Sequence, residues 1–180
     1  MAMIVIAPRQ PALPMGDGLG GRYAEATFSP CRTWRYRLTR MWHTNLPAAN
    51  FIGLNPSTAD ETADDPTIRR CIRYARDWGM GGLVMTNLYG FRSTDPKGLR
   101  TAADPVGPEN DEHLMAAATG AGTVVVAWGA VEPWQQDRAA GVLAALRGTG
   151  RAVHCLALTQ AGQPRHPLYL RADLRPVRYE

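Results

Sequence analysis

Short apolar segments alternate with segments of helical periodicity along most of the chain, and this alternation limits the fold more than any other feature. The predicted strands are residues 51–54, 83–86, 123–128 and 153–158, and the predicted helices between them are residues 66–78, 108–119 and 134–146. Strands that alternate with helices predict a parallel sheet that helices cover on both faces, with right-handed crossovers.

The segment before residue 45 has a different pattern. Residues 22–28 and 33–42 predict two antiparallel strands joined around residues 29–31. In the second strand large apolar side chains alternate with polar ones, which predicts one face exposed to solvent: Trp34, Tyr36 and Leu38 against Arg35, Arg37 and Thr39. The expected fold is therefore α/β, a three-layer α/β/α sandwich around a short, mainly parallel sheet, with an N-terminal antiparallel hairpin.

We expect two parts along the chain. Residues 4–6 favour a strand, and residues 8–21, rich in proline and glycine, favour a loosely ordered arm, so residues 1–21 are predicted to precede the folded part. Residues 22–180 then form a single α/β domain. The chain length of 180 residues suits one domain with a core that needs no disulfide.

The cysteines and the hydropathy favour a cytoplasmic protein. Cys31, Cys71 and Cys155 are odd in number and far apart, and no Cys-x-x-Cys pair suggests zinc binding or thiol exchange. No segment approaches the roughly 20 apolar residues of a membrane helix, and the first residues lack the apolar core of a signal peptide. We expect a soluble protein with no membrane partner and no structural zinc.

The formal charge of +4 comes with two arginine-rich segments. They contain Arg32, Arg35, Arg37 and Arg40 in the first, and Arg69, Arg70, Arg73 and Arg76 in the second. Such segments suit a surface that faces a polyanion, and they are equally typical of a solvated face. Both interpretations remain open at this level.

The first predicted strand of the parallel sheet ends in a Gly-x-Asn-Pro-Ser turn, residues 53–57. A loop at the carboxyl end of such a strand lies where ligands bind in open α/β sheets. The Asn55 amide can orient water or bind a nucleobase edge, and Ser57 with nearby backbone N–H groups can hold an anion. Asn and Ser also stabilise tight turns without any function.

Four carboxylates follow this turn: Asp60, Glu61, Asp64 and Asp65. Oxygen ligands suit magnesium, and paired carboxylates can supply a general base. Carboxylates also favour helix starts, where they complement the helix dipole. Asp65 is the best candidate for this structural role, as an N-cap before Pro66 at the first helical position.

The carboxyl ends of parallel strands meet at one edge of a sheet, so four loops should line one cleft: residues 55–65, 87–93, the region of Gly129, and residues 160–166. His166 would bring a proton donor or a base to this cleft, or it is a surface or packing residue, as a lone histidine often is. Tyr89 and Phe91 could stack on a base or pack in the core below the loop. Trp128 is expected in the core near the cleft.

The chain resembles a bacterial and phage family named domain of unknown function 1643. The resemblance covers most residues after Tyr23 and rests on five segments. They read FSPCRTWRYRLTR, FIGLNPSTADETADDPTIRRC, TNLYGFRSTDP, DPVGPEND and LTQAGQPRHPLYL. The family name implies no reaction.

The chain also resembles, more distantly, the uracil-DNA glycosylase superfamily. Residues 53–56 look like its Gly-x-Asn-Pro motif, whose Asn positions the attacking water, and His166 with Pro167 looks like the start of its His-Pro-Ser motif, whose His stabilises the departing base. Asn87 ends the next strand, where those enzymes place an Asn that reads the base. Leu168 replaces the serine of the second motif, and the Asp-rich insert has no counterpart.

The resemblance implies a nucleobase- or nucleotide-processing enzyme, and N-glycosidic hydrolysis in DNA is its specific form. Asn55 would position water, Asn87 would recognise the base, His166 would stabilise the leaving group, and Asp60 or Asp64 would be a reserve base. Expected substrate contacts come from Gly53, Pro56, Ser57, Tyr89, Phe91, Arg69 and Arg73.

The expected partner is DNA or a nucleotide. No cofactor is required, and Mg²⁺ at the carboxylates remains an option. One alternative is a non-catalytic nucleic-acid-binding or nucleotide-binding module that uses the same cleft, with phosphate contacts from Arg35, Arg37, Arg69 and Arg73. The other is a metal-dependent phosphoester hydrolase that uses the carboxylates between Asp60 and Asp65.

Overall fold

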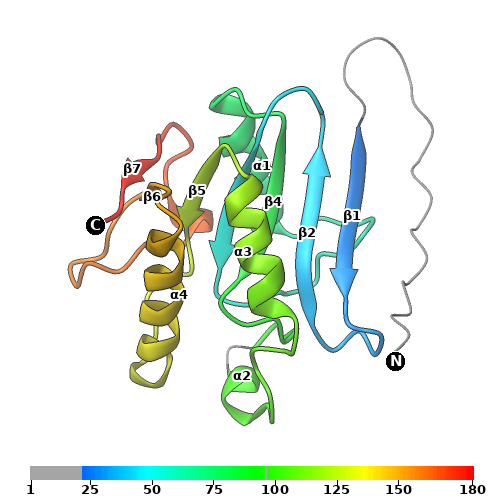
Figure 1. Cartoon of the computed structure of the whole chain (residues 1–180), viewed down its shortest axis with the longest axis vertical. Coiled ribbons are helices and arrows are strands. Elements are labelled where there is room, and N and C mark those ends of the chain that lie inside the picture. The colour runs from blue at the N-terminus through cyan, green and yellow to red at the C-terminus, as the bar shows by residue number, and fades with distance from the viewer. Residues whose placement is uncertain (1–21, 96) are drawn as a thin grey trace, which may run out of the picture.

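A sheet of seven strands forms the middle layer of the protein (Figure 1), in the order β1-β2-β4-β3-β5-β6-β7. The computed structural model describes residues 22–95 and 97–180, so the predicted strand at residues 4–6 and the predicted arm at residues 8–21 lie outside the described residues. The strands are β1 (Tyr23–Phe28), β2 (Arg35–Met41), β3 (Ala48–Gly53), β4 (Gly82–Asn87), β5 (Thr123–Val126), β6 (Val153–Cys155) and β7 (Val177–Arg178).

The middle of the sheet is parallel and its two edges are antiparallel. Strand β3 pairs in parallel with β4 and β5, and β5 pairs in parallel with β6. The hairpin β1–β2 joins β4 in antiparallel fashion, and β7 closes the other edge beside β6. The predicted hairpin and a sheet that is parallel in its middle are therefore confirmed.

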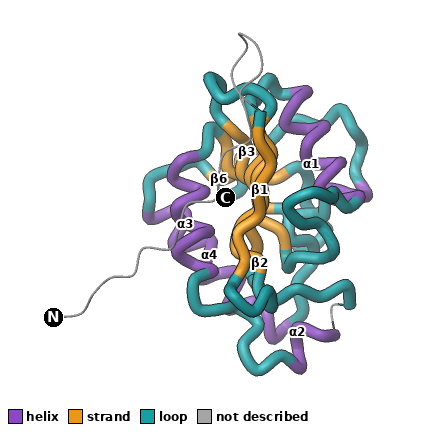
Figure 2. The backbone as a smooth tube through the Cα atoms, turned by 90° about the vertical axis from the view of Figure 1, so that its right-hand side faces the viewer, coloured by secondary structure: helices purple, strands orange, loops and turns teal. Residues whose placement is uncertain are grey.

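Helices cover both faces of the sheet. The helices are α1 (Pro66–Asp77), α2 (Lys97–Thr101), α3 (Asn110–Gly120) and α4 (Gln136–Gly148), with 3₁₀ turns η1 (Pro133–Gln135) and η2 (Pro167–Tyr169). Seen along the sheet in Figure 2, α3 and α4 lie on one side and α1 on the other, which confirms the α/β/α sandwich. None of the described helices is both long and apolar enough to cross a bilayer.

The alternation of side chains along β3 and β5 produces two cores. Phe51 packs with Val125 and Ile68 under α1, whereas Ile52 packs with Val126 on the side of α3 and α4. Phe51 and Ile52 are both fully buried. A strand covered on both faces needs an unbroken apolar run, and this is why the central strands could be recognised from the sequence.

Helix α1 begins where the sequence predicts. The Asp65 side chain accepts a hydrogen bond from the Ile68 N–H at 2.8 Å, and Pro66 occupies the first turn. Ile68, Cys71 and Ala75 face the core. The N-cap therefore fixes the path of the loop that leads from β3 into α1.

The exposed face predicted for β2 is wrong. Arg35 and Thr39 are 2% and 3% exposed, and the loop between β3 and α1 covers Arg35, whose guanidinium bonds to the Ala59 carbonyl. The register shift between Thr27 and Phe28 pairs Thr27 with Arg37 but Phe28 with Arg35, so Tyr36 is an extra residue in β2. Such a β-bulge re-aims the side chains on either side of it.

Several elements were absent from the sequence prediction. Helix α2 has five residues, η2 has three and β7 has two, all too short to show a periodicity. The last predicted strand, residues 153–158, is also too long, since β6 ends at Cys155. The loop after β6 instead runs toward η2, and His166 is its N-cap residue.

Candidate active site

A pocket of about 270 Å³ opens at the carboxyl ends of the parallel strands. All four predicted loops reach it, with Asn55 after β3, Asn87 at the end of β4, Trp128 after β5 and His166 after β6. Strands β3 and β5 are neighbours in the sheet, and their chains continue to helices on opposite faces. The pocket therefore lies at a topological switch point, the usual ligand site of an open α/β sheet.

Asn55 holds its loop and also faces the pocket. Its Nδ2 donates to the carbonyl oxygens of Pro56 at 3.1 Å and Ser93 at 2.8 Å. The backbone N–H of Ser93 donates back to the Pro56 oxygen at 3.0 Å, so the loops after β3 and β4 are joined. With both amide hydrogens engaged, Oδ1 is the atom through which Asn55 can accept a hydrogen bond from a ligand or water.

Asn87 lies over Gly53, so a side chain at position 53 would displace the Asn87 amide. A Cβ atom at position 53 would lie 2.7 Å from Asn87 Oδ1. The Asn87 residue is 3% exposed, and its Nδ2 has no hydrogen-bond partner among the described residues. A buried unsatisfied donor costs about 1–3 kcal/mol, so a ligand acceptor placed here would recover this energy.

His166 is held as a neutral proton donor. Its Nδ1 accepts a hydrogen bond from the Leu168 N–H at 3.4 Å, which requires a lone pair on Nδ1 and leaves the proton on Nε2. Burial lowers the pKa of His166 below its ordinary value, and the nearby Asp65 carboxylate partly opposes this shift. The neutral imidazole therefore presents an N–H group at neutral pH.

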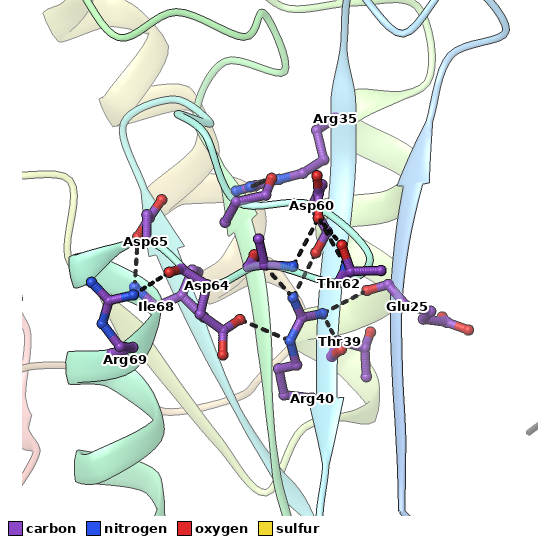
Figure 3. Close-up of polar contacts among 12 residues, drawn as sticks. Glu25, Arg35, Thr39, Arg40, Asp60, Thr62, Asp64, Asp65, Ile68 and Arg69 are labelled. Atoms are coloured by element: carbon purple, nitrogen blue, oxygen red, sulfur yellow. Dashed lines mark hydrogen bonds and ion pairs between the residues drawn. The ribbon is translucent and has the colours of Figure 1, made fainter.

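The predicted reserve bases, Asp60 and Asp64, do not line this pocket. Figure 3 shows their contacts within the loop between β3 and α1. Asp60 Oδ1 accepts hydrogen bonds from the backbone N–H groups of Thr62 and Ala63, both at 2.8 Å, and these bonds lower the pKa of Asp60. Asp64 Oδ1 accepts from Arg40 Nε at 2.9 Å. Their carboxylates hold the loop, whereas Asp65 both caps α1 and lines the pocket.

The predicted substrate contacts divide into two groups. Gly53 and Ser57 line the pocket with Asn87, and Pro56 supports it through its carbonyl. The other four do not line the pocket. Tyr89 is 2% exposed and packs against Trp134, and Phe91 packs on the same core. Arg69 donates to the Asp64 carbonyl, and Arg73 lies 3.9 Å from Asp77 on the exposed side of α1.

Two residues of the pocket are not among those that the sequence predicts for the enzyme. The sequence predicts Arg35 as a phosphate contact of the binding-module alternative and Trp128 as a core residue near the cleft, and both line the pocket with buried nitrogen donors. The one available signal was a charged residue between Trp34 and Tyr36 in an apolar strand. That signal does not reveal the bulge that turns Arg35 toward the pocket.

The described part of the chain, residues 22–95 and 97–180, contains no group of three His, Cys, Asp or Glu side chains that could hold a metal ion. Asp65 is the carboxylate that this part of the chain contributes to the pocket. The pocket is thus lined by amides, hydroxyls, an imidazole, an indole and a guanidinium together with apolar side chains.

A family model described as "Protein of unknown function (DUF1643)" matches residues 35–168, which is more than half of the chain. The matched segment begins at Arg35 and contains Asn55, Asn87 and His166. Comparison with the curated proteins gave no match, and neither did comparison with the solved structures.

Proposed function

The chain belongs to the DUF1643 family, whose description assigns no activity, and we propose that it is a nucleobase- or nucleotide-processing hydrolase that cleaves an N-glycosidic bond. The observation that supports this most strongly is that Asn55, Asn87 and His166 reach one pocket from three separate loops. The resemblance to the glycosylase superfamily rests on these same three residues.

The three side chains can divide the reaction between them. Water attacks the anomeric carbon, a carbon–oxygen bond forms, and the electron pair of the broken carbon–nitrogen bond leaves with the base. Asn55 Oδ1 accepts a hydrogen bond from the water and so orients it. The Nε2–H of His166 stabilises the negative charge that develops on the base, while Asn87 Nδ2 donates to an acceptor on the base edge.

Asp65 is our proposed acceptor for the proton of the water. It lines the pocket, whereas Asp60 and Asp64 are engaged in the loop. One oxygen of Asp65 caps α1, and the second oxygen has no part in that cap. The reaction so described requires no cofactor.

The pocket volume limits the ligand. Pockets for small molecules usually measure roughly 300–1,000 Å³, and about 270 Å³ is slightly below this range. A nucleobase with its sugar and one phosphate is therefore a better match than a dinucleotide.

Base release tests the proposal directly. Nucleotides and uracil- or damage-containing DNA would be incubated with the wild type, Asn55→Ala and His166→Ala, and the free base would be quantified. We expect release by the wild type and a loss of at least about 100-fold in each variant. Thermal unfolding of both variants checks that they fold. Base release that is equal in all three proteins, at the level of buffer alone, contradicts the proposal.

Binding without catalysis is the second candidate, favoured by the exposed arginines of α1. Binding through phosphate contacts weakens steeply as salt rises. Nucleic-acid binding that depends on Arg69 and Arg73, with no base release, would support this candidate over the hydrolase. The metal-dependent phosphoester hydrolase has less support, since Asp60 and Asp64 are already hydrogen-bonded within the loop.

A further inference from the structure

We propose that Arg35 binds a phosphate group of the ligand, so that the pocket is selective for a nucleotide over the corresponding nucleoside. The phosphate site stands on the surroundings of Arg35 alone, whereas the assignment of the rest of the ligand to a nucleotide rests on the proposed function. The phosphate can belong to a free nucleotide or to a DNA backbone, since both present the same group.

Arg35 is a deeply buried cation without a charged partner. Its residue is 2% exposed, and its guanidinium donates from Nη1 to the Ala59 carbonyl at 2.7 Å. Its Nε is buried and has no hydrogen-bond partner among the described residues. No carboxylate of the described chain lies within 4.0 Å of the guanidinium.

The positive charge of Arg35 is not balanced by its surroundings. Burial lowers the pKa of Arg35 to about 10, Asp65 and Asp60 act on it only from a distance, and the nearby Arg92 and Arg40 oppose its charge further. The guanidinium is still protonated at neutral pH. A buried charge that lacks a close partner is costly, and an anion that enters the pocket supplies that partner.

The pocket contains further donors without partners. Asn87 Nδ2 and Trp128 Nε1 are buried and unsatisfied within the described chain, and both residues are 3% exposed. The guanidinium, the amide N–H₂ and the indole N–H are all hydrogen-bond donors, so a ligand that pairs with them must present hydrogen-bond acceptors. Phosphate oxygens and the carbonyl oxygens of a base are such acceptors.

The strand order places these donors along a line. Arg35 is on β2, Asn87 ends β4, Gly53 ends β3, and Trp128 follows β5, and these are successive strands of the sheet. Three strand spacings of about 4.8 Å span about 14 Å. A ligand with its phosphate at Arg35 can therefore extend past Asn87 toward Trp128 and His166 at the other end.

The bulge at Tyr36 is what makes this site. Arg35 and Arg40 are five residues apart and would face opposite sides of a regular strand. Both nevertheless reach the loop between β3 and α1, at Ala59 and Asp64. The extra residue therefore turns Arg35 to the pocket side of the sheet while Tyr36 stacks on His113 of α3.

Calorimetric titration tests the proposal with inorganic phosphate, a nucleoside 5′-monophosphate, the matching nucleoside and a short single-stranded oligonucleotide. We expect the monophosphate to bind wild type at least about 10-fold more tightly than the nucleoside, and Arg35→Met to abolish this preference and the binding of phosphate. Arg147→Met removes an exposed arginine of α4 and should bind like wild type. Preference for the oligonucleotide over the monophosphate assigns the phosphate to DNA, and the reverse assigns it to a free nucleotide.

Equal binding of phosphate and monophosphate by wild type and Arg35→Met overturns the proposal, as does equal affinity of wild type for nucleoside and nucleotide. A second measurement needs no variant: phosphate added to the wild type should shift the NMR signals of Arg35 Nε–H and Asn87 Nδ2–H₂, and unchanged signals at saturating phosphate contradict the site. Base release that depends on Asn55, without any phosphate preference, overturns this inference alone. Phosphate binding without base release overturns the proposed function alone.

Discussion

Two arginines of β2 lie under the same loop, and their surroundings differ sharply (Figure 3). Arg40 is 8% exposed and bonds to the Asp64 carboxylate at 2.9 Å and to the Asp60 carbonyl at 2.5 Å. Arg35 is 2% exposed and has one backbone acceptor. The better-buried guanidinium therefore has the poorer set of partners.

This difference indicates that Arg40 has a structural role and Arg35 a functional one, although both belong to β2. The Asp-rich loop uses Arg40 to neutralise Asp64 and to bind its carbonyls, so the cluster is complete without a ligand. The pocket contains Arg35, Asn87 and Trp128 with buried donors that the described chain leaves unpaired. Buried polar groups are normally satisfied, so unsatisfied donors that share one pocket indicate a place for a ligand.

The largest expected effect is the loss of stability when Arg40 is replaced. Arg40→Met leaves the partly buried Asp64 carboxylate without its partner and should lower the free energy of unfolding by about 3 kcal/mol, the lower end of the range for a broken buried pair. Urea unfolding measures this change. Arg37→Met breaks a more exposed pair with Glu25 and should cost less than about 1 kcal/mol. Equal losses in the two variants would mean that Arg40 has no special role in the loop.

Two neighbouring carboxylates offer the next test. Asp65→Asn keeps a side chain that caps helices well but removes the charge that would take the proton of the water, so base release should fall by about 100-fold. Asp64→Asn should leave the rate within a few-fold, because Asp64 does not line the pocket. Initial rates of base release distinguish the two variants. A larger loss of rate in Asp64→Asn than in Asp65→Asn would indicate that the general base is Asp64, in the loop, and not Asp65.

Arg35→Met should stabilise the free protein. Burial, with smaller contributions from neighbouring charges, lowers the pKa of Arg35 to about 10, which corresponds to about 3 kcal/mol against the charged form. The lost bond to Ala59 offsets part of this gain. We therefore expect the free energy of unfolding in phosphate-free buffer to rise by about 1 kcal/mol. Phosphate should stabilise the wild type but not the variant. If Arg35→Met instead loses as much stability as Arg40→Met, Arg35 has a structural role like that of Arg40.

The smallest expected effect is a shift in the titration of His166. Its pKa should lie below 6.5 because burial disfavours the imidazolium, and Asp65→Asn should lower it further, since Asp65 opposes the shift. The folded-state pKa is thus the lower one, so the linked stability is complete above pH 6.5 and is lost as pH falls through that pKa. NMR titration of the imidazole measures both values. A pKa above 6.5 would contradict the neutral donor.

Much of the framework follows from sequence pattern. The apolar runs around Phe51 and Val125 mark strands buried on both faces, and Asp65 with Pro66 marks the start of α1, because these signals are local. The meeting of Asn55, Asn87 and His166 followed from topology, since parallel strands place their following loops at one edge.

The surroundings of Arg35 could not be predicted in the same way. A regular alternation around Trp34 and Tyr36 implied a solvated face, but one extra residue in β2 changed the side to which Arg35 points. The cover over this face comes from residues 59–64, far along the chain. Bulges and loop cover depend on tertiary contacts, and a period of two does not encode them.

The most direct test of the central claim, that the pocket is a ligand site and the Asp-rich loop is structural, is a crystal structure with a nucleoside 5′-monophosphate. We predict a phosphate oxygen within hydrogen-bond distance of Arg35 Nε, the base beside Asn87, and the contacts of Arg40 unchanged. A nucleotide bound instead at the exposed arginines of α1, with Arg35 Nε still unpaired, would contradict the account.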